Sequence, residues 1–191
     1  LAVLRAIPGL TVVRPCDANE TAEAWRLALE LDGPVALCLS RQGVPTLDRD
    51  RHGPADGLRR GAYVLLDHTA ADRDPDIVLI GTGTEVHIAL EAAEKLRQAG
   101  LSARVVSMPS QEVFHAQPKA YQDQVLPPGP VPRIAIEAGT SFGWHRYVGE
   151  RGLVIGLDHY GASAPYETLY QEFGLTAEAV ITRARSLLNA L

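Results

Sequence analysis

The chain has 191 residues, 46% of them hydrophobic and 21% charged, which suits a globular protein of one large domain or of one domain plus part of another. Its formal net charge of −5 lacks the basic excess of a general nucleic-acid-binding protein. No apolar run approaches the roughly 20 residues of a membrane-spanning helix, and no zinc-type spacing of cysteine and histidine occurs. We therefore expect neither nucleic acid nor a membrane as a partner, and no metal held by this chain.

The first 42 residues alternate between helical and strand patterns. Apolar residues over 10–15 predict a buried strand. Asp17 and Glu20 form a helix-start signature that predicts a helix from Glu20 to Leu31. The continuous apolar run Val35–Leu39 predicts a parallel strand covered on both faces. This region has the pattern of a partial α/β domain.

The chain opens on Leu1, inside a helix-like run and without a methionine or a polar tail. We interpret the sequence as the C-terminal piece of a longer polypeptide. The two cysteines, Cys16 and Cys38, lie in or beside apolar strands, and we expect reduced core thiols in a cytoplasmic protein.

Helical and strand periodicity disappears between residues 43 and 60, where charges, Pro and Gly dominate. This pattern predicts an extended interdomain tether with little to bury. An ordered strap across the following domain is the competing interpretation.

From residue 61 to 191 strands and helices alternate, which predicts an open, mostly parallel sheet flanked by helices. The expected strands are 62–66, 77–80, 103–107, 134–136 and 153–157. The expected helices are 85–99, 111–115, 119–125, 142–148, 166–173 and 176–189.

Ile80–Val86 places two glycines between a strand and a helix, a position where free backbone N–H groups can hold an anion. However, Thr82 and Glu85 also match a capping box, in which the protein satisfies these donors itself. The segment also lacks the third glycine of a dinucleotide-binding motif and the lysine of a P-loop. We favour a structural turn.

Arg41 is the strongest candidate for a ligand residue. It lies in Leu39–Gln42, at the carboxyl end of a predicted strand, where open α/β sheets bind ligands. Its guanidinium suits a phosphate or carboxylate. The alternative is an ion pair that anchors the segment that follows.

The segment Glu137–Tyr147 collects an acid, a histidine and three aromatic residues after another strand. Glu137 and His145 could form an acid–base pair, although nothing in the sequence makes them partners. We expect Phe142, Trp144 and Tyr147 to pack against a neighbouring domain or subunit, because aromatic residues are enriched at interfaces.

No nucleophile stands out. Ser163 precedes Pro165 at the start of a predicted helix, and we interpret it as a cap residue. Four further histidines are expected to be surface residues: His52, His68, His87 and His115.

Ten short motifs in register over nearly the whole chain resemble the C-terminal part of transketolases. They are Leu4–Pro8, Arg14–Thr21, Leu39–Gln42, Ile80–Val86, Arg104–Ser110, Val125–Pro128, Glu137–Gly139, Phe142–Gly149, Tyr160–Pro165 and Glu172–Gly174. The resemblance assigns residues 1–42 to the tail of the pyrimidine-binding middle domain. It makes 43–60 the interdomain tether and 61–191 the C-terminal domain.

For a full-length parent, the resemblance implies thiamine diphosphate with Mg²⁺ or Ca²⁺, a homodimer, and transfer of a two-carbon ketol unit between sugar phosphates of the pentose phosphate pathway. The family's cofactor-activating glutamate, metal ligands and catalytic histidines fall upstream. We therefore expect no catalytic or cofactor-binding residue in this chain, which alone would be inactive and serve assembly and phosphate binding. The arginine that contacts the substrate phosphate in the family corresponds to Arg41.

Two other functions remain open at this point. Another thiamine diphosphate enzyme, such as a deoxyxylulose-phosphate synthase or a dehydrogenase β-subunit, shares this type of C-terminal domain. The chain could also be a non-catalytic assembly module.

Overall fold

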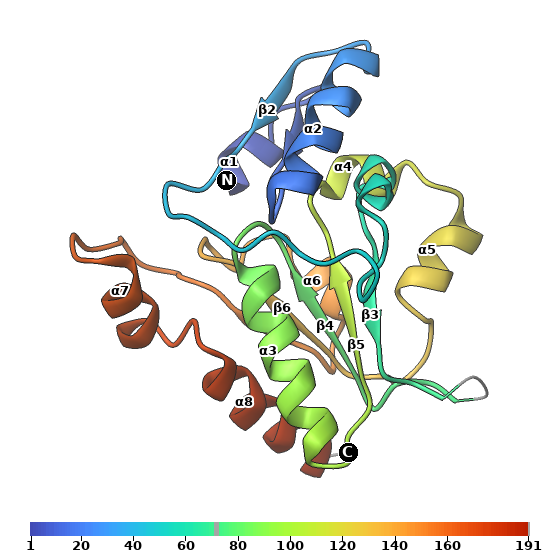
Figure 1. Ribbon diagram of the computed structural model, residues 1–191, viewed down its shortest axis with the longest axis vertical. Helices are drawn as coiled ribbons and strands as arrows, with labels where there is room; N and C mark the ends of the chain where they lie inside the picture. Colours follow the sequence, from blue (N-terminus) through green and yellow to red (C-terminus); the bar gives the residue numbers. More distant parts are fainter. Residues whose placement is uncertain (71–72, 191) are drawn as a thin grey trace.

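The computed structural model describes residues 1–70 and 73–190, which form two sheets (Figure 1). The smaller sheet pairs β1 (Thr11–Val13) with β2 (Val35–Leu37) in parallel. The larger sheet has the order β3-β5-β4-β6-β7, and only β3 runs antiparallel to its neighbour. Its strands are β3 (Tyr63–Asp67), β4 (Ile77–Gly81), β5 (Ala103–Ser107), β6 (Arg133–Ile136) and β7 (Leu153–Ile155). The predicted open, mostly parallel sheet is confirmed.

Helices cover both faces of the larger sheet (Figure 1). The helices of this part of the chain are α3 (Glu85–Gln98), α4 (Gln111–His115), α5 (Lys119–Val125), α6 (His145–Val148), α7 (Tyr166–Glu172) and α8 (Ala177–Asn189). Of these, α7 lies to one side of the sheet (Figure 1). Along β4, Ile77 and Leu79 join the core cluster that includes residues of α3 and α8, whereas Val78 and Ile80 join the cluster that includes Phe114 and Trp144. Because side chains alternate across a strand, this apolar run fills both faces.

Beside β1 and β2 lie α1 (Ala2–Arg5) and α2 (Ala18–Glu30). As predicted, Asp17 caps α2, because its side chain accepts a hydrogen bond of 2.8 Å from the Glu20 N–H. The prediction for β2 is wrong in part: the strand is only half-buried, and Leu39 beyond it is 56% exposed. The smaller sheet has two strands in the described residues and does not cover β2 on both faces.

Glu20 joins the two sheets. Its buried carboxylate accepts hydrogen bonds from the Cys16 N–H (2.8 Å), the Tyr63 hydroxyl (2.8 Å) and the Ser107 hydroxyl (2.6 Å). Tyr63 and Ser107 belong to the larger sheet, so the Glu20 carboxylate is one of the buried groups that link the two parts. The neighbouring Cys16 is buried and free, as expected, whereas Cys38 is free but only half-buried.

Residues 43–60 contact both the first 42 residues and the larger sheet, so the segment is not a tether without contacts. Arg49 forms an ion pair with Asp17 (2.7 Å), and the Gly53 N–H donates to the Leu65 carbonyl (2.8 Å). The 3₁₀ helix η1 (Ala55–Arg60) lies against α2 and buries Leu58 completely. As expected, the segment has little to bury: Leu58 is the one buried residue in 43–60, and it belongs to a core cluster with residues of α2.

Replacing Leu58 with Ala should lower the free energy of unfolding by about 2–5 kcal/mol, the range for a fully buried leucine. Leu29, which is 84% exposed on α2, is a matched control. Its replacement with Ala should change the stability by less than about 0.5 kcal/mol. Urea unfolding of both variants checks this, and equal effects would mean that η1 is not part of the cooperative fold.

The aromatic segment also differs from its prediction. Trp144 is fully buried and Tyr147 is 7% exposed, so both pack in the core, whereas Phe142 is 72% exposed. Trp144 still contacts the neighbouring part of the chain, because the Arg5 guanidinium lies 5.6 Å from the centre of its ring. Trp144 can be buried because its indole N–H donates to Glu137 (2.7 Å). Within residues 1–70 and 73–190, no helix combines the length and the apolar character needed to cross a membrane.

Candidate functional site

Arg41 lies in an exposed loop directly after β2 and lines two cavities. The first, of about 250 Å³, is also lined by Arg14, Gln42, Thr84 and Tyr170 among others. The second, of about 600 Å³, lies between this loop and the start of α7. The guanidinium of Arg41 is therefore accessible to a small anion entering from solvent.

Beneath the smaller cavity lies a buried charge network centred on Glu85, the first residue of α3. Its carboxylate accepts hydrogen bonds from the Arg14 guanidinium, the Thr84 hydroxyl (2.6 Å), the Tyr170 hydroxyl (2.6 Å) and the Ala138 N–H (3.0 Å). The Glu85 side chain is completely buried, and that of Arg14 is 13% exposed. This network joins β1, α3, α7 and the loop after β6.

A second acid, Glu137, extends the network. It accepts two hydrogen bonds of 2.8 Å from the Arg5 guanidinium and lies 3.6 Å from Arg14. Both acids therefore hold arginines from the first 14 residues, and two buried ion pairs dock the smaller sheet on the larger one. Burial alone would raise the pKa of Glu137, but the hydrogen bonds and charge of Arg5 lower it below its ordinary value.

Tyr170 connects this network to the arginine loop. Its hydroxyl donates to Glu85 and accepts a hydrogen bond of 3.3 Å from the side-chain amide of Gln42, the residue after Arg41. The Ser40 hydroxyl in turn donates to the Gln42 carbonyl (3.2 Å). The loop is thus held on both sides of Arg41 while the guanidinium stays exposed.

Burial and the adjacent Glu85 carboxylate raise the pKa of Tyr170 from 10.0 to about 12. The folded state therefore favours the neutral phenol, so this contribution to stability is complete below pH 10 and is lost as the pH rises toward 12. We expect the ultraviolet difference between the chain and its Tyr170→Phe variant to show one tyrosinate that appears near pH 12. A tyrosinate that appears near pH 10 would contradict this contact.

The turn before α3 is built differently from the prediction. Thr84, and not Thr82, is the N-cap residue, and the buried Thr82 hydroxyl has no hydrogen-bond partner within the described residues. The predicted Thr82–Glu85 capping box is therefore wrong, because Glu85 turns inward to Arg14. Gly83 adopts φ +58°, and a Cβ there would lie 2.9 Å from the Arg14 side chain. Its N–H donates to the Arg14 carbonyl (3.0 Å), which favours the structural turn over an anion site.

The other candidates do not assemble into a catalytic group. His145 is exposed at the start of α6, while the buried Glu137 binds Arg5 and Trp144, so the two are not an acid–base pair. Ser163 is exposed, and the N-cap residue of α7 is Pro165. Two histidines are less exposed than predicted: the His68 side chain is 12% exposed, and the His87 Nε2 lies 2.9 Å from the Cys16 carbonyl.

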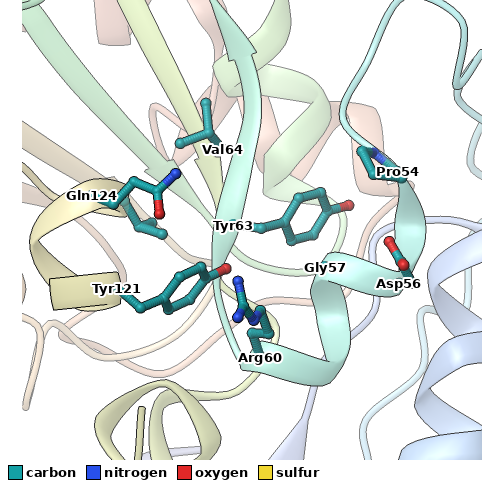
Figure 2. A pocket seen from close by; sticks show the side chains of 9 residues that line it. Pro54, Asp56, Gly57, Arg60, Tyr63, Val64, Tyr121 and Gln124 are labelled. Atoms are coloured by element: carbon teal, nitrogen blue, oxygen red, sulfur yellow. The ribbon is translucent and has the colours of Figure 1, made fainter. Parts of the chain in front are cut away.

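A further cavity of about 440 Å³ lies between η1, β3 and α5 (Figure 2). Three of the polar side chains that line it already have partners. The Arg60 guanidinium lies 4.1 Å from the centre of the Tyr121 ring, and the Tyr121 hydroxyl donates to the Ala62 carbonyl (2.8 Å). Tyr63, also seen in Figure 2, donates to Glu20. We assign no ligand to this cavity.

Comparison with known families decides the relationship. A model described as the transketolase-like TK C-terminal domain matches residues 61–176, and a model of the transketolase pyrimidine-binding domain matches residues 1–46. The chain belongs to the transketolase family. The order of the two matches agrees with the ten motifs in the sequence.

Individual transketolases are similar over the same range. The chain is 50% identical to the transketolase of Geobacillus stearothermophilus, over 99% of its own length and 28% of that relative. It is also 50% identical to the transketolase of Mycobacterium tuberculosis, over 99% of its own length and 27% of that relative. The chain thus spans about a quarter of the length of these relatives.

Solved structures of transketolases are also similar to this chain. The transketolase of Leishmania mexicana superposes with a TM-score of 0.89 at 42% identity, over 99% of this chain and 27% of that one. The transketolase of Pichia stipitis in complex with sedoheptulose-7-phosphate superposes with a TM-score of 0.87 at 34% identity. The match covers 98% of this chain and 26% of that one. The transketolase interpretation is confirmed over the alternative thiamine diphosphate enzymes.

Proposed function

We propose that this chain forms the C-terminal part of a thiamine diphosphate-dependent transketolase that moves a two-carbon ketol unit between ketose and aldose phosphates. The reaction belongs to the pentose phosphate pathway, and the polypeptide works as a cytoplasmic homodimer. In this proposal residues 1–42 complete the pyrimidine-binding domain, residues 43–60 connect the domains, and residues 61–191 are the C-terminal domain.

The accessibility of the Arg41 guanidinium is the main support for a role of this chain in binding the substrate phosphate. It lies after β2 at two adjoining cavities, on a loop held by Tyr170. A planar guanidinium binds phosphate through two parallel hydrogen bonds. Relatives have been solved with sugar phosphates, including sedoheptulose-7-phosphate in the Pichia stipitis enzyme. In our proposal Arg41 binds the phosphate end of the sugar, so that this remote binding energy orients the reacting carbonyl.

The cofactor supplies the carbanion chemistry of ketol transfer. Within the described residues no group of three His, Cys, Asp or Glu side chains is placed to hold a metal ion. In our proposal the Mg²⁺ or Ca²⁺ and the diphosphate of the cofactor are bound by the upstream part of the enzyme. The residues of this chain bind and orient the substrate phosphate and keep the smaller sheet docked.

Ketol transfer by a full-length polypeptide that contains this sequence tests the proposal. With a ketose phosphate donor, an aldose phosphate acceptor, thiamine diphosphate and Mg²⁺, we expect turnover that stops when the cofactor is removed. A purified full-length protein that binds the cofactor and gives no ketol transfer would contradict the proposed reaction.

A further inference from the structure

A small basic cavity lies far from Arg41 in the fold, between α4, α5, α6 and the start of β6. Its volume is about 150 Å³. Arg133, at its wall, is the first residue of β6, whereas Gly83 and Ala138, which line the Arg41 cavity, follow the carboxyl ends of β4 and β6. No residue lines both this cavity and either of the two cavities at Arg41.

Positive charge dominates the lining of this cavity. Lys119, Arg133 and Arg146 contribute three full positive charges, and His115 adds a titratable ring, against the single acid Asp123. Lys119 already forms an ion pair with Asp123. Apolar walls come from Phe114, Leu126, Pro128 and Tyr147. This concentration of cations stands out in a chain whose formal net charge is −5.

Arg133 is the anchored cation of the set. Its guanidinium donates to the carbonyl oxygens of Pro127 (2.6 Å) and Tyr147 (2.7 Å), which fix its orientation. Among the described residues no acidic side chain forms an ion pair with it, and its half-buried position lowers its pKa. Carbonyl dipoles satisfy its N–H groups but leave its net charge uncompensated.

Arg146 is also without an ion-pair partner in the part of the chain that the structure describes. Its guanidinium nitrogen lies 2.6 and 2.8 Å from the two ring nitrogens of His115, a neighbour that offers no negative charge. Glu112 on the same helix does not line the cavity, because its carboxylate accepts from the Val12 N–H and the Ser110 hydroxyl. Two arginines therefore face one small cavity whose single acid, Asp123, forms its ion pair with Lys119.

We propose that this cavity is a second anion site, which binds the dianionic phosphoryl group of a small molecule. Arginine and lysine donors around a narrow opening suit a phosphate, which can accept several charge-assisted hydrogen bonds at once. The small volume of the cavity and the negative net charge of the whole chain favour a free phosphate or a phosphate monoester over a polyanionic chain. This site is independent of the role proposed for Arg41.

Titration of the purified chain with inorganic phosphate, followed by calorimetry and by NMR of the backbone amides, tests the proposal. We expect saturable binding that shifts residues of α4, α5 and α6. In the Lys119→Gln/Arg146→Gln variant, the affinity should fall about tenfold or more, because a hydrogen bond to a charged group contributes about 1.5–3 kcal/mol. Both side chains are on the surface, so the fold should survive.

Matched controls separate this site from general charge effects and from Arg41. Arg183→Gln/Arg185→Gln removes two exposed cations from α8 and should leave the affinity unchanged. Arg41→Gln should also leave the shifts in α4–α6 unchanged. Ribose 5-phosphate binding as well as phosphate would indicate a monoester site, whereas phosphate alone would indicate the free ion. Equal affinity in the Lys119→Gln/Arg146→Gln variant, or loss of these shifts in Arg41→Gln, would overturn the proposal.

Discussion

Replacing Glu85 with Ala is expected to lower the free energy of unfolding by about 3–5 kcal/mol, because it leaves a buried arginine without its counter-charge. The Arg14 side chain is 13% exposed, and its other acidic neighbour, Glu137, lies 3.6 Å away and already binds Arg5. The change also removes the acceptor for the Tyr170 hydroxyl and the Ala138 N–H. Urea unfolding of the purified chain measures the loss.

Two variants separate the charge effect from the loss of packing. Glu91, exposed on the same helix, gives a control in Glu91→Ala, which should cost less than about 0.5 kcal/mol. Arg14→Met/Glu85→Met replaces both charges by apolar side chains and should recover much of the stability, because the desolvation cost disappears with the pair. If Glu85→Ala costs no more than Glu91→Ala, the network does not dock the two sheets.

Replacing Arg41 with Gln in the full-length enzyme is expected to raise KM for phosphorylated substrates about tenfold to a hundredfold, the loss of about 1.5–3 kcal/mol from a charged hydrogen bond. An unphosphorylated ketose donor such as hydroxypyruvate, paired with an unphosphorylated aldehyde, should be used as well by the variant as by the wild type. This split distinguishes a phosphate ligand from a structural arginine, whose loss would impair all substrates alike.

Arg51→Gln is the matched control, because Arg51 is also exposed and lies in the segment that follows the loop. It should leave both KM values unchanged. An Arg41→Gln enzyme with wild-type KM for phosphorylated and unphosphorylated substrates would remove Arg41 from the site.

Much of the larger sheet could be predicted from the sequence because its strands are apolar runs separated by helices of clear periodicity. The predicted and observed spans of α4 and α5 agree, and the Asp17 cap is a local signal of four residues. Element type depends mainly on neighbours along the chain, and these are visible in the sequence. The 3₁₀ helix η1 escaped prediction because Leu58 is apolar among charged and small residues, and only its contact with α2 gives it a buried place.

The buried charge network centred on Glu85, beneath the cavity at Arg41, could not be predicted from the sequence. Arg14 and Glu85 are 71 positions apart, and Tyr170 lies another 85 beyond Glu85. Nothing near Arg14 or Tyr170 in the sequence marks a buried ion pair, since each is an ordinary residue in its own segment. One local signal gave a wrong prediction: the spacing of Thr82 and Glu85 resembles a capping box, but the Glu85 carboxylate binds the distant Arg14. Trp144 was expected at an interface because aromatic residues are enriched there, and its hydrogen bond to the buried Glu137 is not visible in the sequence.

Ketol-transfer activity of the isolated chain tests the central claim most directly. A preparation whose intact mass is near 20.6 kDa would be assayed with thiamine diphosphate, Mg²⁺, a ketose phosphate and an aldose phosphate. The account predicts no turnover, because in our proposal this chain supplies the phosphate-binding arginine and the docking network, and the cofactor site belongs to the upstream part of the enzyme. Turnover that persists after any full-length enzyme is removed would contradict this division of the active site.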